Sequence, residues 1–208
     1  MNMIARFWEA CKKRLFKPGF LFFYNKSLQA GSWRAALLSE VRLREGARVL
    51  QVHIRKSNLS ADFLTRFPSC SLKSVNPFDP APEDGGDLQC LAFQHGMISC
   101  DGASFDAVIC CMALHPLGPT DKLALLKEIR RVLRSGGKLY LADYDMAFSK
   151  GQTLVLIGTG DLYGPDTVLS HADGTWKAQI ELGGFSHFRQ VYSDADASGR
   201  VTILEARR

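Results

Sequence analysis

The stretch FDAVICCMALHPLGPTDKLALLKEIRRVLRSGGKLYLADYD, residues 105–145, decides the fold of this chain. Its first ten residues, Phe105–Leu114, form a continuous apolar run that is typical of a central parallel strand. The segment Thr120–Leu133 then has helical spacing, with its apolar stripe at Leu123, Leu126, Ile129, Val132 and Leu133. The glycines of SGG end this helix, and Lys138–Tyr144 is a second buried strand. The stretch therefore predicts a strand–helix–strand unit.

Strands and helices alternate on both sides of this unit. Before it we expect a helix over residues 21–44, a helix after Asn58, and strands at 47–52, 70–76 and 88–93. After it come an irregular segment, with residues 158–164 as a loop, a helix over 173–182, and strands at 187–192 and 200–206. The last two strands are too close for a parallel crossover, so they should form an antiparallel hairpin. The sequence predicts a Rossmann-like α/β fold, a doubly wound and mostly parallel sheet with a C-terminal antiparallel hairpin.

The bulk composition bounds the domain organisation and the setting. The 208 residues suit one domain, which we expect over residues 45–208, preceded by an N-terminal basic and aromatic helical extension over residues 1–44. The six cysteines have no CxxC pair or metal-ligand spacing, so we expect reduced thiols and no metal site. No apolar stretch reaches the ~20 residues of a membrane-spanning helix, and we expect a cytoplasmic protein.

The positive charge lies mainly at the start of the chain. Residues 1–48 hold ten Lys/Arg and three Asp/Glu, a net +7, whereas the other residues hold 16 and 18, a net −2. Aromatic residues alternate with these basic residues. Four interpretations stay open: peripheral binding of an anionic membrane surface through residues 1–34, docking to a protein partner, a lid over a substrate cleft, or a helix packed on the sheet. Nucleic acid is not an expected partner, because the basic residues do not extend along the whole chain.

The order of elements resembles that of class I S-adenosylmethionine-dependent methyltransferases, and most closely the branch that methylates quinones, lipids and similar small molecules. The residues that carry this resemblance are Phe105, Asp106, Val108, His115, Leu117, Glu128, Arg131, Val132, Leu133, Gly136 and Gly137. GGF followed by a strand and a terminal hairpin resembles the end of the family's domain. The resemblance extends from about residue 25 to the end and implies the class I methyltransferase fold.

In this family a glycine-rich turn after the first strand approaches the cofactor closely, because glycine has no Cβ and permits positive φ. The aligned stretch here is QVHIRKS, with Gln51 at the acidic position and His53, Arg55 and Ser57 at the glycine positions. The resemblance therefore implies a cofactor site whose turn has lost its glycines. Arg55 and Lys56 could instead bind a carboxylate or phosphate, or simply be solvated basic side chains.

Two further parts of the family's cofactor site are also altered. The residue that binds the ribose hydroxyls through a carboxylate aligns with Asn76, which has an uncharged amide, and Asp79 is the nearest substitute. The residue that binds the adenine amino group aligns with Gln94, with His95 as the alternative. Gln94 keeps an acceptor oxygen, so this part is weakened rather than lost.

Two residues are candidates for acid–base chemistry. His115 follows the Phe105–Leu114 strand, at the edge where open α/β sheets bind ligands, and Asp143 follows the next strand. Asp145 and Tyr144 could line the same cleft, and His115 could equally belong to a structural turn before Pro116.

Two functions follow from these patterns. The first is a methyltransferase-like protein with a degenerate S-adenosylmethionine site, which acts as a non-catalytic binding, scaffolding or assembly subunit with a protein partner and without cofactor. The alternative is an active methyltransferase that uses S-adenosylmethionine on a small apolar or lipid-like acceptor, with His115 or Asp143 as the base. A third interpretation, an anionic ligand bound through Arg55 and Lys56, also stays open.

Overall fold

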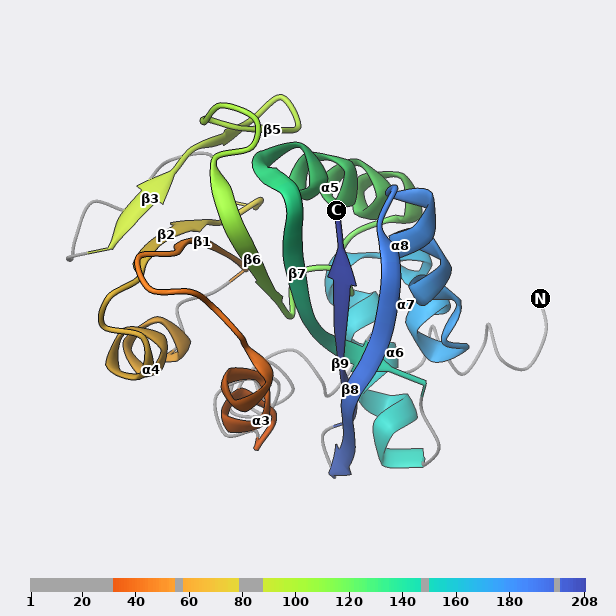
Figure 1. Cartoon of the computed structure of the whole chain (residues 1–208). Coiled ribbons are helices and arrows are strands. Elements are labelled where there is room, and N and C mark those ends of the chain that lie inside the picture. The colour runs from red at the N-terminus through yellow and green to blue at the C-terminus, as the bar shows by residue number, and fades with distance from the viewer. Residues whose placement is uncertain (1–31, 55–57, 79–87, 147–149, 197–198) are drawn as a thin grey trace.

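The computed structural model of the chain describes residues 32–54, 58–78, 88–146, 150–196 and 199–208 (Figure 1). Residues 1–31 of the predicted N-terminal extension and the glycine-position residues Arg55 and Ser57 lie outside these ranges, as do Lys56 and Asp79. Residue 44 is described, but residues 1–31 of the expected extension are not, so the domain boundary at residue 44 stays a prediction.

The described residues form a seven-stranded sheet in the order β3-β2-β1-β6-β7-β9-β8, and a separate two-stranded sheet. The strands of the large sheet are β1 (Arg48–His53), β2 (Ser71–Val75), β3 (Gln89–Leu91), β6 (Phe105–Cys111), β7 (Leu133–Asp145), β8 (Ser186–Asp196) and β9 (Gly199–Arg207). The first five of these pair in parallel, whereas β9 is antiparallel to both β7 and β8. The predicted parallel sheet with a C-terminal antiparallel hairpin is confirmed.

Helices cover both faces of the sheet (Figure 1). They are α3 (Trp33–Glu40), α4 (Leu59–Arg66), α5 (Pro119–Val132), α6 (Lys150–Tyr163), α7 (Pro165–Ala172), the 3₁₀ turn η1 (Thr175–Lys177) and α8 (Ala178–Leu182). One buried cluster contains Trp33 and Leu37 of α3, Phe63 of α4 and Leu156 of α6. The other contains Ile129 of α5 and Ile180 of α8. The two clusters lie on opposite sides of the sheet, as the alternation of side chains along a strand requires.

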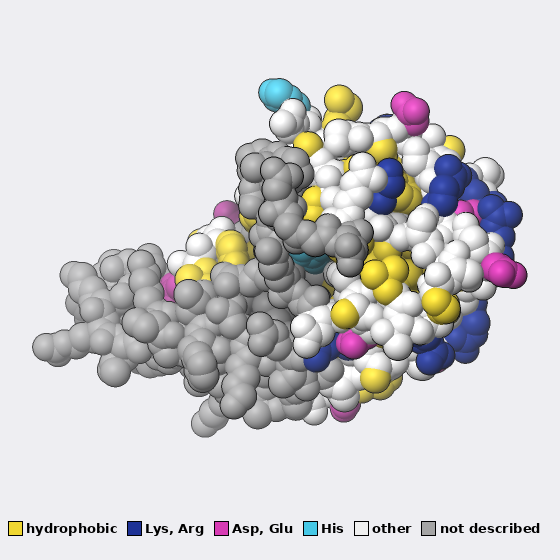
Figure 2. Space-filling view, turned by 90° about the vertical axis from the view of Figure 1, so that its left-hand side faces the viewer, with side chains coloured by type: hydrophobic (Ala, Val, Ile, Leu, Met, Phe, Trp, Pro, Cys, Tyr) yellow, Lys and Arg dark blue, Asp and Glu magenta, His cyan; other side chains and the backbone are white. Residues whose placement is uncertain are grey.

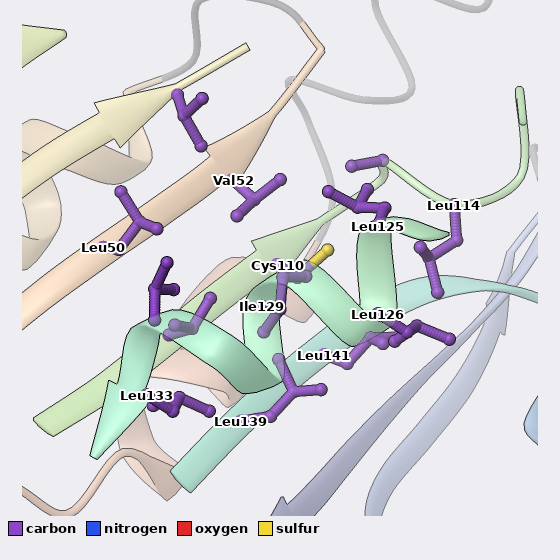
Figure 3. Packing of buried hydrophobic residues seen from close by; sticks show 14 of the residues in the cluster. Leu50, Val52, Cys110, Leu114, Leu125, Leu126, Ile129, Leu133, Leu139 and Leu141 are labelled. Atoms are coloured by element: carbon purple, nitrogen blue, oxygen red, sulfur yellow. The ribbon is translucent and has the colours of Figure 1, made fainter. Parts of the chain in front are cut away.

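The strand–helix–strand unit around α5 forms the centre of the core (Figure 3). Every residue of β6 is buried, as the continuous apolar run predicts for a strand covered on both faces. Leu126 and Ile129 of α5 are fully buried against Leu139 and Leu141 of β7. Burial of each such side chain contributes about 1.5–3 kcal/mol relative to exposure.

The segment after β7 differs from the prediction. We expected an irregular segment with a loop at residues 158–164, but α6 continues to Tyr163 and α7 begins at Pro165. Glycine disfavours the helix interior, which made this segment read as a loop. Leu156 is buried in the core and residues 158–160 are also buried, so the packing of α6 against α7 and β9 offsets the low propensity.

The strand order reverses between β1 and β6. The chain runs outward from β1 through β2 to β3, and then returns to β6 on the other side of β1. In open α/β sheets, ligands bind at the carboxyl ends of the strands beside such a point. The residues that follow β1, β2, β6 and β7 are therefore the ones that define the candidate site.

Candidate functional site

Gln51 of β1 is held by the helix that follows it. The side chain is buried, and its Oε1 accepts a hydrogen bond at 2.7 Å from the Ser60 hydroxyl of α4. The residues after it also turn inward, because Ile54 is buried in the same apolar cluster as Leu50 and Val52. His53 at the end of β1 is half-buried. The position where the resemblance expects an acidic cofactor contact therefore carries an amide whose oxygen already joins β1 to α4.

Asn76 follows β2 and forms a local turn. Its Oδ1 accepts the backbone N–H of Phe78 at 3.0 Å, the geometry of an Asx turn. Its Nδ2 lies 3.5 Å from the carbonyl oxygen of Ile54, which it bonds weakly. The structure thus brings Asn76 beside the turn after β1, as the alignment predicted. Both groups of the amide, however, bind the protein's own backbone.

Gln94 lies in a short hairpin that follows β3. It belongs to β4 (Phe93–Gln94), which pairs with β5 (Met97–Ile98) in the two-stranded sheet, and its side chain is exposed. Glu128 of α5 accepts the Ile98 N–H at 2.7 Å, and this bond fixes β5 to the helix. In Figure 1 β5 lies beside the start of β6, whereas Gln94 follows Leu91, the carboxyl end of β3, by three residues. The structure therefore brings Gln51 and Asn76 to one edge of the sheet, and Gln94 follows the strand that pairs with β2, with its side chain exposed in the hairpin.

His115 and Asp143 form a buried hydrogen-bonded pair. His115 Nδ1 lies 2.6 Å from Asp143 Oδ1, and both side chains are almost completely buried. Asp143 also accepts the backbone N–H groups of Leu114 and Tyr144, each at 2.8 Å. Burial alone would raise the pKa of Asp143, but the charge and hydrogen bond of His115 lower it to about 2. Asp143 is therefore an ionised carboxylate that fixes the loop after β6 to the end of β7.

Two further polar residues beside this pair were not predicted as site residues. His171 of α7 lies with its ring centroid 6.1 Å from that of His115, and its Nδ1 donates to the Tyr144 carbonyl oxygen at 2.7 Å. Its Nε2 is buried without a hydrogen-bond partner among the described residues. Lys122 of α5 is fully buried, and its Nζ donates to the Thr167 carbonyl oxygen at 2.5 Å and to Ser170 Oγ at 3.0 Å.

Burial changes the charge states of both residues. It lowers the pKa of His171 to about 3, with Asp143 opposing the change and the Lys122 charge adding to it. It also lowers the pKa of Lys122 to about 8, again against the attraction of Asp143. His171 is therefore neutral near pH 7. We call His115, Lys122, Asp143 and His171 the buried polar cluster. No sequence pattern marked Lys122 or His171, because each stands in a helix where a polar residue is expected to face water.

The buried polar cluster has one feature of an acid–base site and lacks another. A carboxylate on Nδ1 fixes the tautomer of a histidine, as Asp143 does for His115. A general base must also reach the proton that it removes. The His115 side chain has no exposed surface. In the described state, the cluster therefore joins β6, α5, β7 and α7 rather than facing an open cleft.

An apolar groove of about 450 Å³ lies on the other side of α7, between α6 and α7. Its lining residues are Thr153, Leu156, Ile157, Pro165, Val168, Leu169 and Ala172. Thr153 is the only one with a polar side chain, so the groove suits an apolar ligand or segment.

Thiols and metal-binding groups contribute no site among the described residues. Burial raises the pKa of the adjacent thiols of Cys110 and Cys111, so both stay protonated and unreactive. Within the described ranges, no three His, Cys, Asp or Glu side chains form a group that could hold a metal ion. No helix in those ranges is long and apolar enough to cross a membrane.

Comparisons with known proteins place these features in a family context. A family model described as a methyltransferase domain matches residues 29–141, which is more than half of the chain. No curated protein sequence matches the chain significantly.

Solved structures give the same fold. The S-adenosylmethionine-dependent methyltransferase from Aquifex aeolicus superposes with a TM-score of 0.62 at 15% identity, over 93% of this chain and 99% of the other. Phosphoethanolamine N-methyltransferase 2 of Haemonchus contortus, in complex with phosphomonomethylethanolamine and S-adenosylhomocysteine, superposes with 0.64 at 12% identity, over 89% of this chain and 56% of the other. A chain of the Haloferax volcanii complex between the Trm112 methyltransferase activator and a protein named as a methyltransferase gives 0.63 at 15%, over 93% and 99%. At these identities the likeness shows the fold alone.

Proposed function

The chain belongs to the methyltransferase domain family, and from that premise we propose that it is a non-catalytic member with a degenerate cofactor site, acting as a binding or assembly subunit. The observation that carries this proposal is the hydrogen bonding of the side-chain amides of Gln51 and Asn76 at the carboxyl ends of β1 and β2. The Gln51 oxygen accepts from Ser60, and the Asn76 oxygen accepts from the Phe78 N–H. Each amide oxygen therefore already accepts one hydrogen bond inside the protein, which leaves it at most one lone pair for a ligand.

The chemistry of these residues argues in the same direction. A ribose presents two hydroxyl donors, which a carboxylate accepts through two oxygens and with a full charge. Asn76 has one acceptor oxygen and no charge. The stretch Gln51–Ser57 contains no glycine, so each residue carries a Cβ where a close backbone approach needs none. These residues do not fit S-adenosylmethionine.

Without a cofactor, the fold can still act by binding a protein partner. A Haloferax volcanii chain of similar fold occurs in complex with the Trm112 methyltransferase activator, which supports the idea that this fold can present a surface to another protein. The buried polar cluster supports a rigid scaffold as well, because it fixes four elements of the domain to one another. The membrane-surface role of residues 1–34 stays a prediction, since residues 1–31 lie outside the described part of the chain.

A thermal-shift experiment with S-adenosylhomocysteine tests the proposal. A ligand at 100 times its dissociation constant stabilises the folded state by about 2.7 kcal/mol, roughly 5–10 °C for a chain of this size. We expect no shift for the wild type. The matched variant restores the family pattern through Gln51→Asp, His53→Gly, Arg55→Gly, Ser57→Gly and Asn76→Asp, and should gain a shift. A wild-type shift of several degrees would contradict the proposal.

An active methyltransferase on a small apolar or lipid-like acceptor is the second candidate. It is favoured by the Asp143–His115 pair at 2.6 Å, which has the orientation of a carboxylate-assisted base, and by the apolar groove between α6 and α7. It requires α7 or the loop after β6 to move, because His115 is fully buried. Transfer of a labelled methyl group from S-adenosylmethionine to an apolar acceptor, abolished by His115→Gln, would favour this candidate.

A further inference from the structure

Basic residues from distant parts of the sequence gather at the amino edge of the large sheet, opposite the candidate site. Figure 2 shows Lys and Arg side chains along one flank of the molecule, with few acidic side chains between them. We define the amino-edge basic surface as Arg42, Arg44, Arg48, Arg134, Lys138, Arg189, Arg207 and Arg208. They come from the segment before β1 and from β1, β7, β8, β9 and the residue after β9.

Two buried carboxylates connect these cations into one surface. Asp106 at the start of β6 lies 2.8 Å from Arg44, 2.6 Å from Arg134 and 3.9 Å from Arg48. Glu205 of β9 lies 3.0 Å from Lys138 and 3.2 Å from Arg189.

The ends of β7 and β9 complete the surface. Arg207 is paired with Lys138 across these two strands. The Arg208 guanidinium donates to the backbone carbonyl oxygen of Leu133, next to Arg134. The surface is therefore continuous from the segment before β1 to β8.

The surface carries more positive charge than the fold neutralises. Its eight cations face Asp106, Glu205 and the exposed Glu45, so eight minus three leaves a net side-chain charge of +5. Asp106 has three arginine partners for one negative charge. The side chains of Arg44, Arg48 and Arg189 stay 68%, 55% and 62% exposed, so their unshared N–H groups face solvent. Cations held this close repel one another.

The side chains of the amino-edge basic surface indicate which kind of partner it would bind. Seven of its eight cations are arginines, whose planar forks bind carboxylates through two hydrogen bonds. Membrane-surface sites add apolar side chains that enter the lipid, and single-stranded nucleic acid sites add exposed aromatic rings for base stacking. The exposed large apolar side chains among the described residues are Leu64, Phe78, Met97, Met146, Leu169 and Leu182, and none belongs to this surface.

We propose that the amino-edge basic surface docks an acidic, Asp/Glu-rich segment of a partner protein. Because the surface lies at the opposite end of the parallel strands from the residues after β1 and β2, such a partner leaves the candidate site uncovered. The inference therefore stands whether or not the site binds a cofactor.

The test uses the full chain and a fluorescent 12-residue peptide of alternating Asp and Glu, measured by anisotropy at ~50 mM and ~200 mM salt. Arg207→Glu is the test variant, because the described residues give its side chain no hydrogen bond or ion pair to lose. Lys127→Glu, on the exposed side of α5, is the matched control with the same change of charge. Poly-uridine and phosphatidylserine vesicles are titrated in parallel.

The proposal expects saturable binding of the peptide that Arg207→Glu weakens about fivefold or more and Lys127→Glu changes less than twofold, with weaker binding at the higher salt. Arg189→Glu should weaken binding to a similar degree. Circular dichroism checks that each variant is folded. Equal losses from both charge reversals at positions 207 and 127, no binding of the peptide, or tighter binding of poly-uridine or of the vesicles would each overturn the proposal.

Discussion

Acid should destabilise this protein through His171, and the substitution His171→Gln should remove that sensitivity. His171 is buried and its pKa in the folded protein is about 3, whereas an unfolded histidine titrates near 6.5. The pKa is lowered by folding, so below pH 6.5 the unfolded chain binds a proton that the folded chain does not. Stability therefore falls as the pH drops through 6.5 and continues to fall toward pH 3.

The magnitude follows from these two pKa values. Each pH unit inside this window costs about 1.4 kcal/mol per proton. Integrated from pH 7.5 to pH 5.0, the single histidine removes about 2 kcal/mol from the free energy of unfolding. Asp143, with a pKa of about 2, contributes nothing to this interval, because both its states are ionised above pH 5.

Urea unfolding at pH 7.5 and at pH 5.0 measures the effect. We expect the wild type to lose about 2 kcal/mol more than His171→Gln over this interval. The substitution also changes stability at pH 7.5, but the comparison uses only each protein's own difference between the two pH values. His187→Asn serves as the control, because His187 is exposed on β8. An equal loss in the wild type and in His171→Gln would refute the reasoning.

Three further substitutions test the packing around the site. Asp143→Ala leaves the buried His115 ring and the Leu114 and Tyr144 N–H groups without their acceptor, and should cost about 3–5 kcal/mol in urea unfolding. The folded chain releases the Lys122 proton near pH 8 and the unfolded chain near pH 10.5, so the wild type should gain about 3 kcal/mol of stability between these pH values. Lys122→Met should abolish this gain. The same dependence of stability on alkaline pH in both proteins would contradict this. Gly137→Ala places a Cβ 2.8 Å from the Arg134 carbonyl oxygen and should cost about 1–3 kcal/mol, whereas Gly102→Ala, with its closest contact at 3.4 Å, should cost clearly less; similar melting temperatures for the two would count against it.

Local pattern predicted most of the fold because the sheet is buried on both faces. The apolar run at Phe105–Leu114 matched β6, and the helical spacing that follows it matched α5. The short link between the last two strands correctly required an antiparallel hairpin. Helix α6 was missed because three glycines lower its propensity, and only its packing against α7 and β9 stabilises it.

The candidate site was less predictable, because the hydrogen-bond partners of its side chains are not visible in the local sequence pattern. The alignment brought Gln51 and Asn76 to one edge of the sheet, but no local pattern could say that Ser60 and Phe78 use their oxygens. The alignment also placed Gln94 in the site, and the structure puts it in a hairpin after β3 with its side chain exposed, so its role stays a prediction.

Two further features could not be predicted from the sequence, because they depend on contacts between distant parts of the chain. Lys122 and His171 read as helix-surface residues, because their burial depends on how α7 packs on α5 and β7. The amino-edge basic surface was also invisible, since its charges are dispersed along the chain and meet only through the sheet.

Calorimetric titration of the full wild-type chain with S-adenosylhomocysteine tests the central claim most directly. The account predicts no heat of binding at ligand concentrations up to about 1 mM, a limit near −4 kcal/mol of binding free energy. This prediction rests on the missing carboxylate charge at positions 51 and 76 and on the protein hydrogen bond that each amide oxygen already accepts. A one-to-one isotherm with a micromolar dissociation constant, lost in a Gln51→Leu variant, would contradict it and return the chain to the cofactor-binding members of its family.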